Sequence, residues 1–291
     1  MHVLRVAIVA AISAIPVLHI ASAADLPVKA PVAPVAASYS WTGAYFGLNF
    51  GYGWGDKTVS NSPNDPLAAS LFAGTLGAPG EQPLVSSYSL RQKGAVGGFE
   101  AGYNWRAGPN WVWGLEGDFS FSGVRGNASG TSVLQAPPFT LYTQSLNAAQ
   151  STDWYGTVRG RLGWLATPNL LLFGTGGVGY GRVTDSANYT FNGPAVGFSQ
   201  IAGGVSFACF ANTPCFTGAS SATRIGWTAG GGAEWLISQS VSFKIEYQFV
   251  DLGTETVQIT ATPFPGFAAS SFNAQFRNQI QTVRGGVNFH F

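Results

Sequence analysis

The chain has 291 residues, of which only 9% are charged and 14% are aromatic, and it contains 39 Gly. An ordinary soluble domain carries about 25% charged residues, so this composition favours an all-β membrane protein with one large domain. The formal net charge is only +1. Without a basic patch, the chain lacks the charge pattern of a nucleic-acid-binding protein, so no nucleic acid partner is expected.

The N-terminal segment has the pattern of an export signal. Arg5 precedes an apolar run over residues 6–20, and small residues follow it, which predicts a signal peptide over residues 1–23. An uncleaved anchor helix is the alternative, but the apolar run is shorter than the roughly 20 residues that a helical span needs. Residues 24–40 are rich in Pro, Val and Ala and are expected to form an extended periplasmic linker. Residues 41–291 then remain for a barrel in the bacterial outer membrane, where only closed barrels satisfy every backbone polar group.

Alternation with period two predicts eight strands in this last domain. In chain order they cover residues 41–54, 91–106, 111–121, 152–165, 170–183, 223–236, 241–249 and 278–291. Short turn signals join three of the strand pairs, at residues 107–110, 166–169 and 238–240. Four longer segments lack periodicity and are predicted to be loops, at residues 55–90, 122–151, 184–222 and 253–277. The predicted fold is an all-β, eight-stranded antiparallel up-and-down transmembrane β-barrel whose short turns face the periplasm.

The hairpin over residues 152–183 carries the strongest alternation. On its first arm the apolar side chains fall at even numbers, namely Trp154, Val158, Leu162 and Trp164. Polar side chains fall at odd numbers, namely Asp153, Thr157, Arg159 and Arg161. A helix would mix the arginines with the aromatic residues, whereas a strand separates them onto an apolar and a charged face. Each arm is long enough for a transmembrane strand, which needs about 9–11 residues.

Eight of the nine Trp share the parity of the apolar face and gather at strand ends. They are Trp54, Trp105, Trp111, Trp113, Trp154, Trp164, Trp227 and Trp235. This distribution is typical of two interfacial aromatic girdles. A soluble barrel, the alternative, would concentrate its large aromatic residues in the middle of the strands.

The opposite face collects charges that are expected to point into the barrel. They are Arg159, Arg161, Lys244, Arg284, Glu100, Glu116, Asp118, Glu234 and Glu246. The interior of an eight-stranded barrel is barely wide enough for side chains, so opposite charges there should pair. We therefore expect a polar plug in the lumen; the alternative is a narrow ion pathway, as in a small porin.

Cys209 and Cys215 are the only cysteines and lie in a predicted loop. In an oxidising compartment they are expected to form a local disulfide, with a pair of free thiols as the alternative. No further ligands lie nearby in the sequence, so no metal site is predicted. The stretch over residues 174–179 fits G-x-G-x-x-G, but no helix is expected after it, so it does not predict a nucleotide site.

Catalytic residues are not predicted, and the chain is not expected to be an enzyme. His290 is the only His after the signal peptide and falls at the periplasmic end, so a Ser/His/Asp triad at the outer rim is excluded. No cofactor is predicted. Haem capture by the loops would have to use Tyr142, Tyr189 or other aromatic residues, since these loops contain neither His nor Met.

The final strand ends in an alternating apolar pattern. Val287, Phe289 and Phe291 form it, and we interpret it as the terminal signal that outer-membrane barrels present to the barrel assembly machinery. The alternative is an apolar last strand that ends there by chance.

Nine segments, in order, resemble the alphaproteobacterial outer-membrane immunogenic, porin-like small β-barrel proteins of the OmpA-type transmembrane barrel superfamily. They are DLPVKAPVAP, WTGAYFGLNFGYGWG, GFEAGYNW, WVWGLEGDFSFSG, WYGTVRGRLGW, LLLFGTGGVGYG, GWTAGGGAEWLIS, SFKIEYQFVDLG and TVRGGVNFHF. The resemblance covers all eight predicted strands, while the long loops match no pattern.

This resemblance implies an integral outer-membrane protein with a structural and surface-antigen role in the cell envelope. Some members are porins and some bind haem, so both remain alternatives. Expected partners are outer-membrane lipids and lipopolysaccharide, the assembly machinery, and peptidoglycan-associated proteins or a second copy of the chain.

Overall fold

The computed structural model describes residues 40–76, 82–136, 140–192, 198–210 and 212–291. The predicted signal peptide and almost all of the predicted linker lie outside these residues. Among the described residues, no helix is long and apolar enough to cross a membrane.

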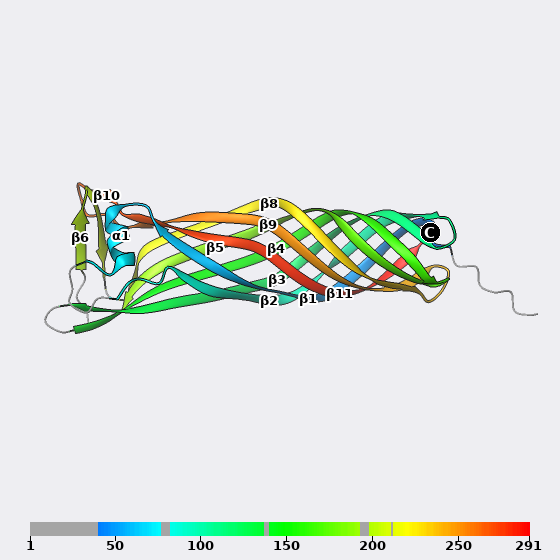
Figure 1. Cartoon of the computed structure of the whole chain (residues 1–291), viewed down its shortest axis with the longest axis horizontal. Coiled ribbons are helices and arrows are strands. Elements are labelled where there is room, and N and C mark those ends of the chain that lie inside the picture. Colours follow the sequence, from blue (N-terminus) through cyan, green and yellow to red (C-terminus); the bar gives the residue numbers. More distant parts are fainter. Residues whose placement is uncertain (1–39, 77–81, 137–139, 193–197, 211) are drawn as a thin grey trace, which may run out of the picture. The chain divides into compact units, whose positions relative to one another are not determined.

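Eight strands form one closed antiparallel barrel in the order β1-β11-β9-β8-β5-β4-β3-β2, so the predicted fold is confirmed (Figure 1). Each barrel strand pairs with the next barrel strand along the chain, and β1 closes the ring on β11. The strands are β1 (Gly43–Pro63), β2 (Ser87–Ala107), β3 (Trp111–Ala136), β4 (Thr140–Thr167), β5 (Leu170–Asn192), β8 (Thr213–Leu236), β9 (Val241–Ala261) and β11 (Ser271–His290).

Between the two predicted girdles, the strands follow the predicted alternation. Large apolar side chains on the outer face are exposed, including Phe50, Leu115, Val158, Ile225 and Ile245. A belt of exposed apolar side chains around a closed barrel matches the hydrocarbon core of a bilayer. We call this part the membrane belt; on β1 it ends at Trp54.

The four predicted loops are wrong at both of their ends, because the flanking barrel strands continue into each of them. The β3–β4 pairing extends from Trp111↔Trp164 to Ala136↔Thr140, with one register shift between Phe121 and Val124. Beyond Phe121, β3 continues to Ala136, a rise of roughly 35–40 Å at about 3.3 Å per residue and a tilt of about 40°. We call this part of the barrel, beyond the membrane belt, the extension.

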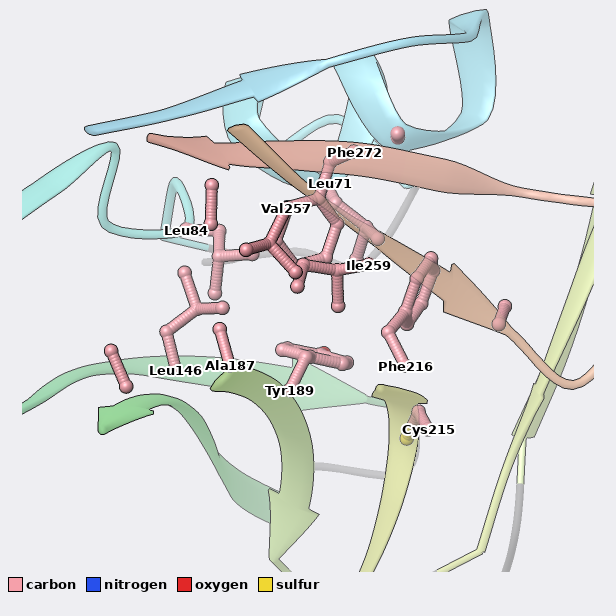
Figure 2. Close-up of a cluster of buried hydrophobic side chains, with 14 of the residues drawn as sticks. Leu71, Leu84, Leu146, Ala187, Tyr189, Cys215, Phe216, Val257, Ile259 and Phe272 are labelled. Atoms are coloured by element: carbon pink, nitrogen blue, oxygen red, sulfur yellow. The ribbon is translucent and has the colours of Figure 1, made fainter. Parts of the chain in front are cut away.

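The extension reverses the polarity of the membrane belt, since its apolar side chains point inward and form the largest hydrophobic core of the protein. Figure 2 shows side chains from several strands meeting in the barrel interior, among them Leu146 of β4, Tyr189 of β5, Ile259 of β9 and Phe272 of β11. The extension is therefore built like a water-soluble barrel, on top of a barrel built for lipid.

A short helix and a small sheet complete the end of the extension. The helix α1 (Pro66–Ala73) buries Leu67, Ala68 and Leu71 in the core of the extension. The sheet has the order β10-β7-β6, with β6 (Phe198–Ala202), β7 (Val205–Cys209) and β10 (Ala268–Ala269). Neither element was predicted.

Asp153 of the central hairpin lies on the outer face of the barrel and not on the inward face that the sequence predicted. The register of β4 against β5 shifts between Thr152 and Trp154, so Asp153 is exposed on the outer face, where it lies 3.9 Å from Arg182. A bulge adds one residue to a strand, and the residues after the bulge therefore face the opposite side. The prediction that Asp153 belongs to the inward charged face is wrong.

Candidate functional site: the filled lumen

The nine predicted lumen charges come together inside the membrane belt, and none is more than 4% exposed. Six strands of the ring supply them, because alternate residues of each strand point inward at this level. Glu100 comes from β2, Glu116 and Asp118 from β3, Arg159 and Arg161 from β4, Glu234 from β8, Lys244 and Glu246 from β9, and Arg284 from β11.

Arg159 is the centre of this network. Its guanidinium contacts Glu116 and Glu246 and lies 2.9 Å from Asp118. Arg284 completes the group, at 3.2 Å from Asp118 and 2.9 Å from Glu246. The strand register explains two of these contacts, because Glu116 is directly opposite Arg159 and Glu246 is directly opposite Arg284.

A second group lies nearer the short turns. Arg161 contacts Glu234, and its guanidinium lies 4.0 Å from the centre of the Phe173 ring, a cation–π distance. Glu234 also accepts a hydrogen bond from Asn288 at 2.9 Å and lies 3.4 Å from His290. Every charge of this group therefore has a partner within the lumen.

Three carboxylates, Glu100, Glu116 and Glu246, lie close enough together to hold a metal ion. The ammonium of Lys244 already lies among them, in contact with Glu100, 3.1 Å from Glu116 and 3.7 Å from Glu246. A cation of the chain itself thus balances this cluster, and we do not assign a metal to it.

Apolar layers close the lumen on both sides of the charges. Toward the short turns lie Trp41, Val112, Leu165, Leu171, Phe173 and Leu236. Toward the extension lie Val96, Val124, Tyr155, Val183, Val250, Leu252 and Ile280. Trp41, the one Trp that departs from the girdle pattern, is 1% exposed and donates a hydrogen bond from Nε1 to the carbonyl of Pro168 at 3.0 Å.

A further polar layer lies beyond the second apolar layer, and three of its residues, Lys57, Gln150 and Asp185, fall in segments predicted to be loops. Gln150 donates hydrogen bonds from Nε2 to Asp185 at 2.6 Å and to Asn278, and it contacts Gln92. Lys57 lies 3.5 Å from the Gln150 side-chain oxygen. Burial lowers the pKa of Lys57 to about 7 and raises the pKa of Asp185 above its ordinary value. Lys57, Gln150 and Asp185 were missed from the sequence because no inward face was assigned to the predicted loops, and Gln92 and Asn278, at the ends of their predicted strands, were not singled out.

The predicted girdle residues lie on the outer face of the belt. Trp111, Trp113, Trp164, Trp227 and Trp235 are each between 45% and 55% exposed. Trp54, Trp105 and Trp154 are half-buried, and Trp105 stacks on Trp113 with ring centres 4.4 Å apart. These eight Trp side chains therefore lie on the outside of the barrel rather than in its core.

The other predicted residues are also placed. Cys209 and Cys215 form a disulfide that joins β7 to β8 within the core of the extension, not in a loop. Val287, Phe289 and Phe291 are exposed on the outer face, and Phe291 is 84% exposed.

Tyr189, one of the two Tyr considered for haem, is buried in β5 and donates a hydrogen bond to Gln144 at 2.8 Å, so its predicted loop position is wrong. Tyr142 also lies in a strand, β4.

Known proteins resemble this chain over nearly its whole length. The profile of the family described as outer membrane protein beta-barrel domain matches residues 26–290. The 31 kDa outer-membrane immunogenic protein of Brucella melitensis is 32% identical over 275 residues, which is 93% of each chain. The 25 kDa outer-membrane immunogenic protein of Brucella abortus is 23% identical over 100% of each chain. The solved outer membrane protein OprG of Pseudomonas aeruginosa is 11% identical, with a TM-score of 0.39 over 88% of this chain and 100% of that chain.

Proposed function

Since the chain belongs to the outer membrane protein beta-barrel domain family, and thus lies in the outer membrane, we propose that it is a non-conducting anchor for a rigid surface extension. The single observation that supports this proposal is the layered filling of the lumen. Two apolar layers enclose nine buried charges, and a third apolar core fills the extension. An ion crossing such a barrel would have to enter apolar layers without partners, which costs several kcal/mol or more.

The competing function is a small porin. Conductance measured in planar lipid bilayers distinguishes a porin from a non-conducting anchor. We expect the native protein to give no large, stable conductance steps. A variant with Trp41→Ala and Leu171→Ala thins only the layer nearest the short turns and should also stay closed, because the second apolar layer and the core of the extension remain intact. Large, stable steps from the native protein would overturn the proposal.

The proposal also sets the orientation, with the extension outside the cell and the short turns in the periplasm. A Cys at Ser129, exposed in the extension, should react with a membrane-impermeant maleimide on intact cells, because β3 carries it beyond the belt. A Cys at Asn110, exposed in a short turn, is the matched control and should react only after the outer membrane is permeabilised. The opposite labelling pattern would refute the orientation.

The surface role extends what the relatives' names say. The Brucella proteins are named as immunogenic outer-membrane proteins, and a folded extension that rises above the lipid would be the part that antibodies reach. Catalysis is not part of the proposal, because the carboxylates of Glu116 and Asp118 bind Arg159 in the closed lumen, where no substrate reaches them.

A further inference from the structure

The barrel wall opens just above the membrane belt, between β1 and β11. Their paired register stops at Trp54↔Gln281 and resumes at Ser60↔Gln275. A groove of about 530 Å³ lies at this opening. It is lined by Asp56, Lys57, Arg91, Thr254, Arg277 and Gln279, together with neighbouring polar residues.

The groove carries an excess of positive charge. Lys57, Arg91 and Arg277 face one carboxylate, that of Asp56. Asp56 lies 3.6 Å from Arg91, but both side chains are more than three-quarters exposed, so this pair is worth little. Among the residues that the structure describes, no carboxylate lies within 4 Å of Arg277 or Lys57.

Lys57 approaches the groove from the inner side of the wall. Lys57 is only 8% exposed, and its ammonium lies 3.5 Å from the side-chain oxygen of Gln150, which is a long distance for a hydrogen bond. A Cβ added to Gly55 would lie 3.6 Å from the Lys57 Nζ, so the side chain passes along the opening. The carboxylates of Asp185 and Asp251 compensate this buried ammonium only in part, and an anion in the groove would offset the remaining cost of burial.

The neighbouring strands continue the positive surface. Lys93 on β2 is directly opposite Arg125 on β3, both are exposed, and Lys93 is also opposite Trp54 at the edge of the belt. Like charges directly opposite each other destabilise a sheet unless something neutralises them. In the part of the chain that the structure describes, no carboxylate lies within 4 Å of either cation.

The position of this surface identifies the anion. It begins immediately beyond the aromatic edge of the belt, which is the level of the lipid headgroups. We propose that the groove between β1 and β11 binds a phosphate group of the outer-leaflet glycolipid, with Arg91 and Arg277 as its main ligands and Lys57 as the inner cation. Guanidinium groups bind phosphate through paired, charge-assisted hydrogen bonds. This inference rests on the proposed orientation, which places the groove at the outer leaflet.

The test compares two double variants of the full-length protein in detergent micelles. The groove variant carries Arg91→Gln and Arg277→Gln. The control carries Arg106→Gln and Arg182→Gln, which remove the same charge from the end of β2 beside a short turn and from an exposed pair with Asp153. Migration of heated and unheated samples shows that both variants are folded. The probe is diphosphorylated lipid A, the dephosphorylated lipid serves as its control, and inorganic phosphate as the soluble competitor.

We expect the native protein and the control to retain diphosphorylated lipid A and the groove variant to bind it at least about tenfold more weakly, since a hydrogen bond to a charged group contributes about 1.5–3 kcal/mol. Equal binding by all three proteins, an equal loss in both variants, or equal binding of the dephosphorylated lipid would overturn the site. Competition by inorganic phosphate at the same concentration as the lipid would assign the groove to free phosphate and overturn the glycolipid. Micelles have no inside or outside, so this result is independent of the labelling experiment that tests the orientation.

Discussion

Lys57 is a buried cation whose nearest charges, those of Asp185 and Asp251, only partly compensate it. Desolvation lowers its pKa from 10.5 to about 7, against the opposing effect of these two carboxylates. Between pH 7 and 10.5 the unfolded chain therefore binds more protons at this residue than the folded protein does. The free energy of unfolding should rise with pH across this window, by at most about 1.4 kcal/mol per pH unit from this group.

The variant Lys57→Met should therefore stabilise the lipid-free protein most below pH 7, where the native protein buries a charged ammonium, and progressively less as the pH approaches 10.5. Urea unfolding in detergent at both ends of this window measures the difference. A gain that does not change with pH would contradict the linkage to Lys57.

Arg159 differs from Lys57 because its charge is compensated. Replacing it with Met leaves Glu116, Asp118 and Glu246 without their shared cation, and breaking a buried ion pair costs roughly 3–5 kcal/mol. The temperature at which the compact form converts to the unfolded form, as seen on a gel, should fall clearly. Arg182→Met, which breaks an exposed pair with Asp153, should change it little, and equal effects would show that burial does not decide the strength of the pair.

At the scale of strands and helices, the sequence predicted the membrane belt and missed the extension. The belt has strong contrast between its faces, so alternation located all eight strands. In the extension the contrast is weak, as where Leu146, Ala148 and Gln150 point inward between polar or small outward residues. The change of solvent from lipid to water reverses which face is apolar, and the bulge at Asp153 reverses the parity of β4. A search for one continuous pattern therefore stops at the edge of the belt.

The side chain of Asp65 connects α1 to the barrel through hydrogen bonds. Its Oδ1 accepts hydrogen bonds from the amides of Leu67 and Ala68 at 3.1 and 2.9 Å, which caps the helix. Its carboxylate also accepts a hydrogen bond from the Ser270 hydroxyl, at 3.0 Å, and from the amide of Ser271, at 2.7 Å. One side chain thus holds the start of α1 against the start of β11.

The variant Asp65→Ala should detach α1 without unfolding the belt, since loss of the cap alone costs about 1 kcal/mol and the bonds to β11 are lost as well. Faster hydrogen exchange and faster proteolysis in α1, with unchanged exchange in the belt strands, is the expected result. Asp65→Asn, which keeps an acceptor oxygen, should lose less. Uniformly faster exchange throughout the barrel would show that α1 is not a separate unit.

At the scale of the whole molecule, the outer-membrane location and the family resemblance predicted from the sequence are confirmed. The lumen charges were also identified from the sequence, because parity within the belt places them on one face and a narrow barrel leaves them no other partners. The layers above and below them could not be predicted. Trp41 departs from the parity of the apolar face of its predicted strand, and Lys57, Gln150 and Asp185 come from segments far apart in the sequence that only the closed ring brings together.

Assembly of the whole barrel provides the last prediction, which concerns Phe291. Its side chain is 84% exposed on the outer face, while its backbone amide donates a hydrogen bond to Ala44 at 2.9 Å. The variant Phe291→Ala keeps that bond and removes almost no buried surface, so its stability and its refolding into detergent should match those of the native protein. If the side chain is part of the signal that the assembly machinery reads, the amount of folded barrel in the outer membrane should nevertheless fall.

The comparison of refolding with assembly in cells separates recognition from stability. Ile225→Ala removes another exposed apolar side chain, from the middle of β8, and should lower neither quantity. A fall in both refolding and assembly for Phe291→Ala would mean that the residue acts through stability of the strand. Normal assembly of Phe291→Ala in cells would show that the assembly machinery does not recognise this side chain. The exposed ring would then contribute neither to the stability of the fold nor to insertion into the membrane.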